Sequence, residues 1–139
     1  AERDTEELQK IAELMSIDEI HLFNTSGTIY SGTVPLYYGY NFGSGEQIAY
    51  FKPMLKDKSL TMCQDVTPNT SNGKKMMYAI TWNDDGTKMI QVGIEPRRLL
   101  NEVKQNNCIK NKITTVQNRK TARFSNIATT FFTLFICFL

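Results

Sequence analysis

The chain has 139 residues, the length of one ordinary domain, and 41% of them are hydrophobic while 22% are charged. This composition is typical of a globular protein and excludes a wholly disordered chain, collagen and a coiled coil. Three cysteines (Cys63, Cys108 and Cys137) and a single histidine are present. Their spacing excludes a structural zinc site and does not favour a disulfide framework, so we expect neither a metal nor a cofactor.

The charge is unevenly distributed along the chain. Residues 1–108 hold 11 of the 16 basic residues and all 14 acidic ones, whereas residues 109–139 hold five basic residues and no acidic one. The longer segment is therefore mildly acidic, and it has no basic patch interleaved with aromatic residues. We infer that the protein does not bind nucleic acid.

The last part of the chain differs in composition from the rest. Residues 110–123 are polar and basic, and residues 127–139 are apolar apart from three threonines. As a helix, the apolar stretch would rise about 20 Å, which is less than the roughly 30 Å of a hydrocarbon core. Three interpretations stay open: a truncated membrane span, an interfacial anchor, or out-of-frame sequence after a genuine domain. We divide the chain into a domain at 1–107 and a tail at 108–139.

The domain is predicted to begin with a helix and a hairpin. Asp4 and Glu7 have the spacing of a capping box at a helix start. Apolar residues then follow at helical spacing: Leu8, Ile11, Ala12 and Met15. Two strands are expected at 19–23 and 28–31, joined by a four-residue turn in which Gly27 supplies the positive φ.

A second helix and three further strands are predicted after the hairpin. Ser44 and Gln47 indicate the helix start, and Pro53 is expected to kink or divide this helix. Strands are expected at 60–66, 76–82 and 88–94, because turn-forming residues separate these apolar runs. Pro96 then indicates the start of a last helix. The apolar residues of this helix are Leu99, Leu100 and Val103.

The order of these elements predicts the fold class. Three consecutive strands joined by hairpin-length connections favour an antiparallel sheet. Together with the first hairpin they give a five-stranded sheet, with an N-terminal helix, an inserted helix over one face and a C-terminal helix. We therefore predict an α+β fold.

Catalytic chemistry is not indicated. His21 alternates with Glu19 and Phe23 along a strand, and no nucleophile motif stands beside it, so we interpret it as an ordinary strand histidine. Cys63 lies in a predicted strand, where a buried and inert thiol is expected. The sequence has no glycine-rich phosphate loop, no paired carboxylates at a defined spacing and no nucleophile elbow. We expect the protein not to be an enzyme.

The segment at 36–43 contains four aromatic residues and two glycines. Its tyrosines, Tyr37, Tyr38 and Tyr40, could line a small-molecule pocket in which their hydroxyls orient a polar ligand. They could equally form the lid of the hydrophobic core, and the two interpretations are compatible.

Three further residues complete the predicted pocket. Lys52 follows on the second helix, and Tyr78 and Trp82 share one face of a strand. A cation and hydroxyl groups near an aromatic floor would suit a carboxylate-bearing metabolite. A solvated lysine and ordinary sheet packing are the alternatives. Gln64 and Asp65 are either turn formers or pocket contacts.

Two motifs carry a resemblance to a known family. One is the hairpin Asp18-Glu19-Ile20-His21-Leu22-Phe23 with its turn and Gly27-Thr28-Ile29, and the other is the step Val92-Gly93-Ile94-Glu95-Pro96. With the Tyr-Tyr-Gly-Tyr loop between them, residues 5–106 resemble the PAS-like fold of Cache-type extracytoplasmic sensor domains in bacterial membrane receptors.

This resemblance implies a sensory role outside the cytoplasmic membrane. Such domains bind small metabolites, such as amino acids or carboxylates, and relay a conformational change to a histidine kinase, a cyclic-di-guanylate enzyme or a chemoreceptor. The expected partners are a small-molecule ligand, the membrane through flanking segments, and a second copy of the chain through the terminal helices. The alternative is a ligand-free module that mediates dimerisation or interaction, in which Leu8, Ile11 and Met15 form either the dimer seam or the domain core.

Overall fold

The expected succession of helices and strands is present in a computed structural model, which describes residues 4–97. The five strands are all antiparallel and form one sheet, and the helices lie on its two faces, so the predicted α+β class is confirmed. The predicted helix that carries Leu99, Leu100 and Val103 lies outside the described residues, and so does the tail at 108–139.

Helix α1 (Thr5–Met15) begins at the predicted cap. The side chain of Asp4 accepts a hydrogen bond of 2.8 Å from the backbone N–H of Glu7, which satisfies one of the free donors at the helix start. Ser16 adopts the left-handed conformation, with a φ of 55°, and ends the helix. The buried face of α1 packs on the sheet through Leu8, Ile11 and Ala12. Leu8 and Ile11 therefore belong to the domain's own core.

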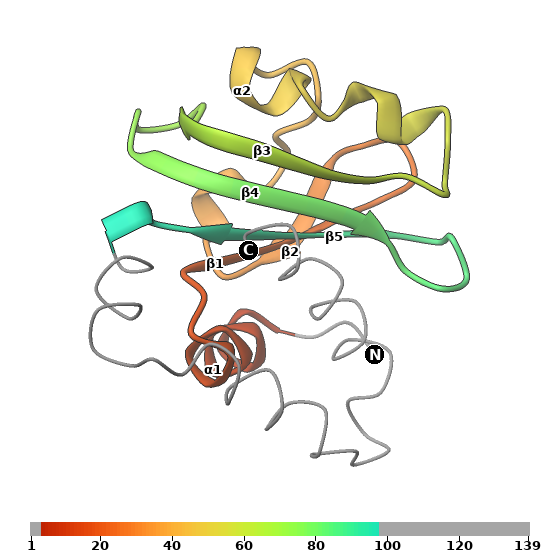
Figure 1. Ribbon diagram of the computed structural model, residues 1–139. Helices are drawn as coiled ribbons and strands as arrows, with labels where there is room; N and C mark the ends of the chain where they lie inside the picture. Colours follow the sequence, from red (N-terminus) through yellow and green to blue (C-terminus); the bar gives the residue numbers. More distant parts are fainter. Residues whose placement is uncertain (1–3, 98–139) are drawn as a thin grey trace, which may run out of the picture.

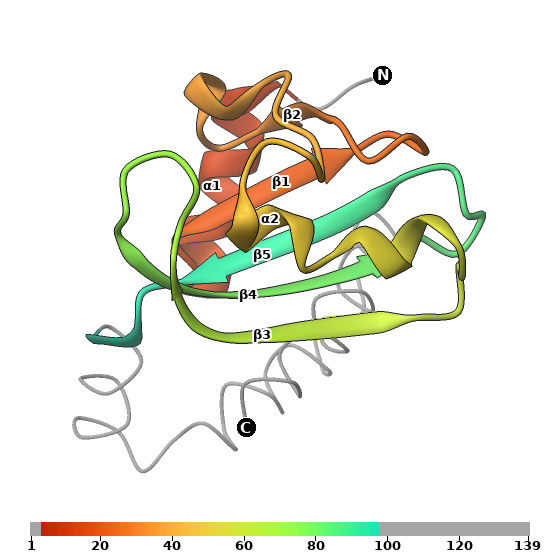
Figure 2. The same cartoon turned by 90° about the horizontal axis from the view of Figure 1, so that it is seen from above.

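The strands are β1 (Glu19–Phe23), β2 (Ile29–Gly32), β3 (Thr61–Pro68), β4 (Lys75–Trp82) and β5 (Met89–Ile94). Their order in the sheet is β2-β1-β5-β4-β3, so the first and the last strands are neighbours in the middle of the sheet (Figure 2). The register places His21 opposite Gln91, and it places Gly93 between Glu19 on β1 and Tyr78 on β4. Polar side chains distant in sequence therefore meet on one face of the sheet.

The two faces of the sheet bury separate cores. Helix α1 covers one face, and the short helices η1 (Pro35–Tyr37), α2 (Glu46–Ala49) and η2 (Lys52–Leu55) cover the other (Figure 1). Residues alternate between these faces along each strand: Ile20 and Leu22 of β1 face α1, whereas Phe23 packs beneath the short helices. The predicted second helix is divided just before Pro53, as its sequence indicated.

Candidate functional site

A small cavity lies between the sheet and the segments that cover its second face. Its volume is about 20 Å³, which is room for about one water molecule. The sheet contributes the lining residues His21, Ile29, Tyr78 and Gln91. The covering segments contribute Tyr37, Tyr40, Gln47, Ile48, Asn69, Thr70 and Ser71. The side of the cavity opposite the sheet is thus formed by three segments: the η1 loop, helix α2 and the turn between β3 and β4.

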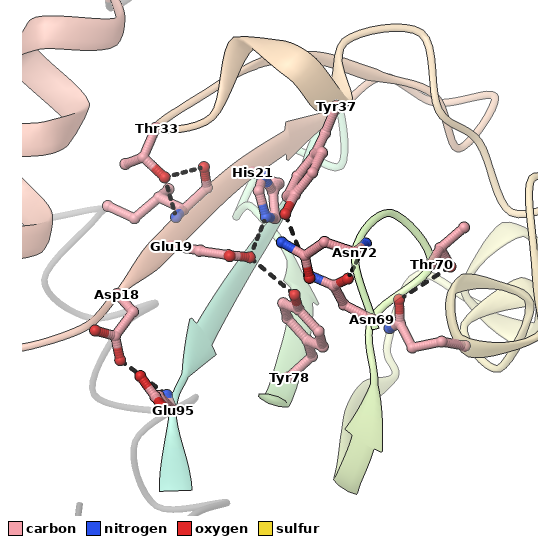
Figure 3. A network of polar contacts seen from close by, with 12 residues as sticks. Asp18, Glu19, His21, Thr33, Tyr37, Asn69, Thr70, Asn72, Tyr78 and Glu95 are labelled. Carbon is pink, nitrogen blue, oxygen red and sulfur yellow. Dashed lines mark hydrogen bonds and ion pairs between the residues drawn. The ribbon is translucent and has the colours of Figure 1, made fainter. Parts of the chain in front are cut away.

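The floor of this site is a buried polar cluster of Glu19, His21 and Tyr78 (Figure 3). The Tyr78 hydroxyl donates to Glu19 Oε2 over 2.8 Å, and His21 Nε2 lies 3.1 Å from the same oxygen. Because a carboxylate offers only acceptors, Nε2 carries the proton of this contact. The cluster orients the imidazole and fixes its tautomer.

Two glycines make room for the cluster. A Cβ atom at Gly93 would lie 2.6 Å from Cε1 of Tyr78, so only glycine lets the Tyr78 ring cross β5 toward Glu19. A Cβ atom at Gly32 would lie 2.5 Å from the carbonyl oxygen of Ile20 and 3.1 Å from His21 Nδ1. These side chains can therefore approach so closely only because positions 32 and 93 are glycines, which have no side chain.

Tyr37 and Asn69 join two of the covering segments above the floor. Asn69 Nδ2 donates to the Tyr37 hydroxyl over 3.1 Å, and Asn69 Oδ1 accepts from the backbone N–H of Asn72. The Tyr37 ring lies 5.3 Å from the His21 ring and stacks on Tyr40 at 6.0 Å. The η1 loop and the β3–β4 turn therefore meet directly over His21.

A second set of contacts fastens helix α2. Gln47 Nε2 donates to Gln64 Oε1 over 2.9 Å, and Gln64 Nε2 donates back to the Gln47 carbonyl oxygen over 3.0 Å. Thr70 donates to Gln47 Oε1 over 3.3 Å, which connects α2 to the β3–β4 turn. The cover of the cavity is thus held together by side-chain hydrogen bonds that a modest rearrangement can break.

Two buried nitrogens in the lining have no hydrogen-bond partner: His21 Nδ1 and Gln91 Nε2. The exposed fractions of these residues are 2% and 3%, so bulk water does not reach them. An unpaired buried polar group costs about 1–3 kcal/mol. Such groups in a native structure call for an explanation, and a bound water or ligand in the cavity that His21 and Gln91 line would supply the missing partners.

The electrostatics of the site disfavour additional negative charge. Burial, together with the nearby Glu19 carboxylate, raises the pKa of Tyr78 above its ordinary value, and the same causes raise the pKa of Tyr37. Lys74, near the rim, forms a salt bridge of 3.0 Å with Glu95, and this contact raises its pKa. The phenols are therefore neutral hydrogen-bonding groups at physiological pH.

The structure brings together three of the six residues predicted to bind a ligand. Tyr37, Tyr40 and Tyr78 line the cavity. Tyr38, Lys52 and Trp82 do not line it. The assignment of these residues to ligand binding stays a prediction.

Two of the residues outside the cavity have structural contacts that explain their positions. The Tyr38 hydroxyl bonds to both backbone groups of Gly32 and to Thr5 Oγ1, so it fastens the loop to β2 and α1. Trp82 Nε1 donates to the Met54 carbonyl oxygen over 3.0 Å, which fastens η2 to the sheet. The Lys52 side chain is exposed at the start of η2.

Sequence reasoning missed Gln91 and Asn69 and undervalued His21. Strand alternation correctly placed His21 beside Glu19, but it gave no sign that both side chains are buried. Gln91 lies within an apolar run of the sequence. A single amide residue in such a run was the available sign that a polar side chain is buried there. Asn69 belongs to a segment interpreted as a turn, and its burial results from contacts with the distant η1 loop.

Two open questions about β3 are answered by the structure. Gln64 is buried and contacts Gln47, whereas Asp65 is exposed, so only Gln64 contributes to the cover of the cavity. Cys63 is disulfide-bonded. The expectation of an inert free thiol at this position is therefore wrong.

Within residues 4–97, no group of three or more histidine, cysteine, aspartate or glutamate side chains is arranged to hold a metal ion. None of the helices in this part of the chain is long and apolar enough to cross a membrane.

The fold is similar to that of two solved bacterial proteins. One is the sensor domain of the Vibrio cholerae histidine kinase DctB (TM-score 0.54, 15% identity), matched over 74% of this chain and 40% of that one. The other is the Bacillus subtilis YkuI protein, which has an EAL domain and was solved with its substrate c-di-GMP and calcium (TM-score 0.53, 13% identity, 71% and 27% coverage). The chain thus spans less than half the length of either. No protein-family model matches it, and no curated protein is similar to it in sequence.

Proposed function

We propose that this chain is the small-molecule-sensing domain of a bacterial membrane receptor of the PAS-like, Cache type. The ligand binds in the cavity between the sheet and its three covering segments. One observation carries this proposal: His21 and Gln91 both line the cavity, and each has a buried nitrogen without a hydrogen-bond partner in the protein. The likeness of the fold to the DctB sensor domain supports it.

Signalling in this proposal begins with movement of the covering segments. A cavity of about 20 Å³ is too small for a metabolite, so binding requires the cover to open and close again around the ligand. The cover is held by the Asn69–Tyr37 and Gln47–Gln64 contacts, which a ligand can replace. A ligand that binds one arrangement of the cover more tightly than the other shifts the population toward that arrangement. The conformational change is then passed to the part of the receptor that follows the domain.

An extracytoplasmic location is part of the proposal. Cys63 is disulfide-bonded, and disulfides form and persist in oxidising compartments such as the periplasm and the cell surface. The described residues account for the sensor domain only. The membrane attachment and the output domain, whether a kinase, a chemoreceptor or a cyclic-di-guanylate enzyme, belong to the remainder of the receptor.

The test is a thermal-shift screen of the full chain against amino acids, small carboxylates, amides, purines and polyamines. A ligand present at 100 times its Kd adds about 2.7 kcal/mol to the stability of the folded protein, which raises Tm by several degrees. Tyr37→Phe, which removes a cavity hydroxyl, is expected to reduce the shift, whereas Tyr50→Phe on the exposed surface is the control. A folded protein that responds to no member of the panel contradicts the proposal.

A ligand-free interaction module remains the second candidate, because Leu14 on α1 and Leu36 on η1 are both 74% exposed. Leu8 and Ile11 are buried within the domain and Met15 packs partly against the same core, so Leu14 is the exposed apolar residue on α1 for a dimer seam. Light scattering of the wild type and of Leu14→Ser separates the two candidates. A dimer that dissociates in the variant, without any ligand response, favours the interaction module.

A further inference from the structure

The charges around the cavity restrict what it binds. No lysine or arginine among residues 4–97 lines it, and Glu19 lies directly behind His21 and Tyr78. Lys74, whose charge acts on the lining residue Tyr37, is paired with Glu95. Because Glu19 carries one negative charge, the cluster of Glu19 and His21 is at most neutral, whichever protonation state the imidazole has. The lining among residues 4–97 therefore supplies no lysine or arginine to pair with an anionic ligand, and a buried carboxylate lies behind it.

The two unpaired nitrogens have opposite hydrogen-bonding roles. His21 Nε2 carries a proton because it faces the Glu19 carboxylate, so Nδ1 is an acceptor whenever the ring is neutral. Gln91 Nε2 is an amide nitrogen and can only donate. His21 and Gln91 are paired directly across β1 and β5, and side chains in this relationship have Cβ atoms about 4.5–5.5 Å apart. The lining thus includes, on adjacent strands, one residue with an unpaired acceptor and one with an unpaired donor.

We propose that the cavity recognises an uncharged primary amide group on a small ligand, in preference to a carboxylate of the same shape. The amide N–H donates to His21 Nδ1, and the amide carbonyl oxygen accepts from Gln91 Nε2. A carboxylate has two acceptors and no donor, so it leaves His21 Nδ1 without a partner and adds a negative charge near Glu19. This inference rests on the proposed function, since it names the ligand chemistry of the same site.

The test compares matched pairs of probes with the full chain at neutral pH: nicotinamide against nicotinate, and propionamide against propionate. At least one amide is expected to bind about tenfold more tightly than its acid, as measured by calorimetry or thermal shift. Tighter binding of the acids overturns the inference but leaves a ligand-binding sensor intact. If neither amide binds, the inference is wrong, and the broader screen then decides the proposed function separately.

Gln91→Met locates the interaction, because methionine keeps the length of the side chain and removes the donor. Amide binding is expected to weaken about tenfold in this variant. Gln9→Met is the matched control, since Gln9 lies on α1, on the opposite face of the sheet, and donates to the Thr33 carbonyl oxygen. Equal amide affinity in both variants and the wild type contradicts the proposal, provided that the fluorescence of Trp82 shows Gln91→Met to be folded.

A spectroscopic signature separates recognition by His21 from a structural effect. His21 is the single histidine of the chain, so nitrogen NMR of the labelled imidazole reports on it alone. Nε2 is expected to be protonated in the free protein, and the Nδ1 resonance is expected to shift when the amide donates to it. Binding of an amide that leaves the Nδ1 resonance unchanged overturns the assignment of His21.

Discussion

The hydroxyl of Tyr78 donates a hydrogen bond of 2.8 Å to Glu19 Oε2 across the central strand β5. These residues are 59 positions apart in the sequence, and the bond exists because Gly93 has no side chain between them. The pair holds a buried carboxylate next to the only histidine, and it therefore fixes both the charge and the geometry of the cavity floor.

Removing this hydroxyl is expected to destabilise the protein. Tyr78→Phe leaves the buried Glu19 carboxylate with one donor fewer, and a hydrogen bond to a charged group contributes about 1.5–3 kcal/mol. Urea unfolding measures the change. Tyr50→Phe is the matched control, because its hydroxyl donates to the Cys63 carbonyl oxygen at a site where the Tyr50 side chain is half-exposed. Equal losses in the two variants would show that the Tyr78–Glu19 bond has no special role.

Gly93→Ala is expected to cost about 1–3 kcal/mol, as overpacking in a core commonly does. The new methyl group would lie 2.6 Å from Cε1 of Tyr78 and displace the ring from Glu19. The cost should largely disappear when the same substitution is made in a Tyr78→Ala background, which a double-mutant cycle measures. A full additional loss in that background would place the clash elsewhere.

Stability is expected to fall as the pH rises above about 10. Burial raises the pKa of Tyr78 and Tyr37 above the ordinary value of 10.0, so the folded state keeps phenolic protons that the unfolded state releases. Because the folded state binds more protons in this range, the free energy of unfolding decreases with increasing pH. The raised pKa of Lys74, which is held by Glu95, acts in the same direction.

Ultraviolet absorbance of tyrosinate checks this expectation. Two of the six tyrosines should ionise only as the protein unfolds. The alkaline loss of stability should be smaller in Tyr78→Phe than in the wild type. Ionisation of all tyrosines before unfolding would contradict the burial of these two.

The disulfide at Cys63 can be tested by chemical modification. In protein oxidised and then denatured without reductant, Cys63 should resist alkylation, and it should react after reduction. Mass spectrometry of peptides from the full chain measures both states. Full alkylation of Cys63 without reductant would show that it is not disulfide-bonded. The disulfide would then no longer support an oxidising compartment for this protein.

The local structure of the domain could be predicted from its sequence because local interactions specify it. The contact of Asp4 with Glu7, the positive φ of Gly27 (79°) and the division of a helix at Pro53 each depend on residues within a few positions of one another. Strand alternation placed Glu19 and His21 on one face for the same reason. The number of strands and their antiparallel arrangement then followed from short connections.

The tertiary structure alone decided which of these residues form a site. Only the strand order puts β5 beside β1, which brings Gln91 next to His21 and lets Tyr78 reach Glu19 past Gly93. The same packing moves Trp82 and Lys52 away from the cavity and draws in Asn69 from a turn. Burial and partner choice arise from contacts between segments distant in sequence, and no local pattern encodes them. The sequence therefore determined the elements and their faces, whereas long-range packing determined the cavity and its unpaired nitrogens.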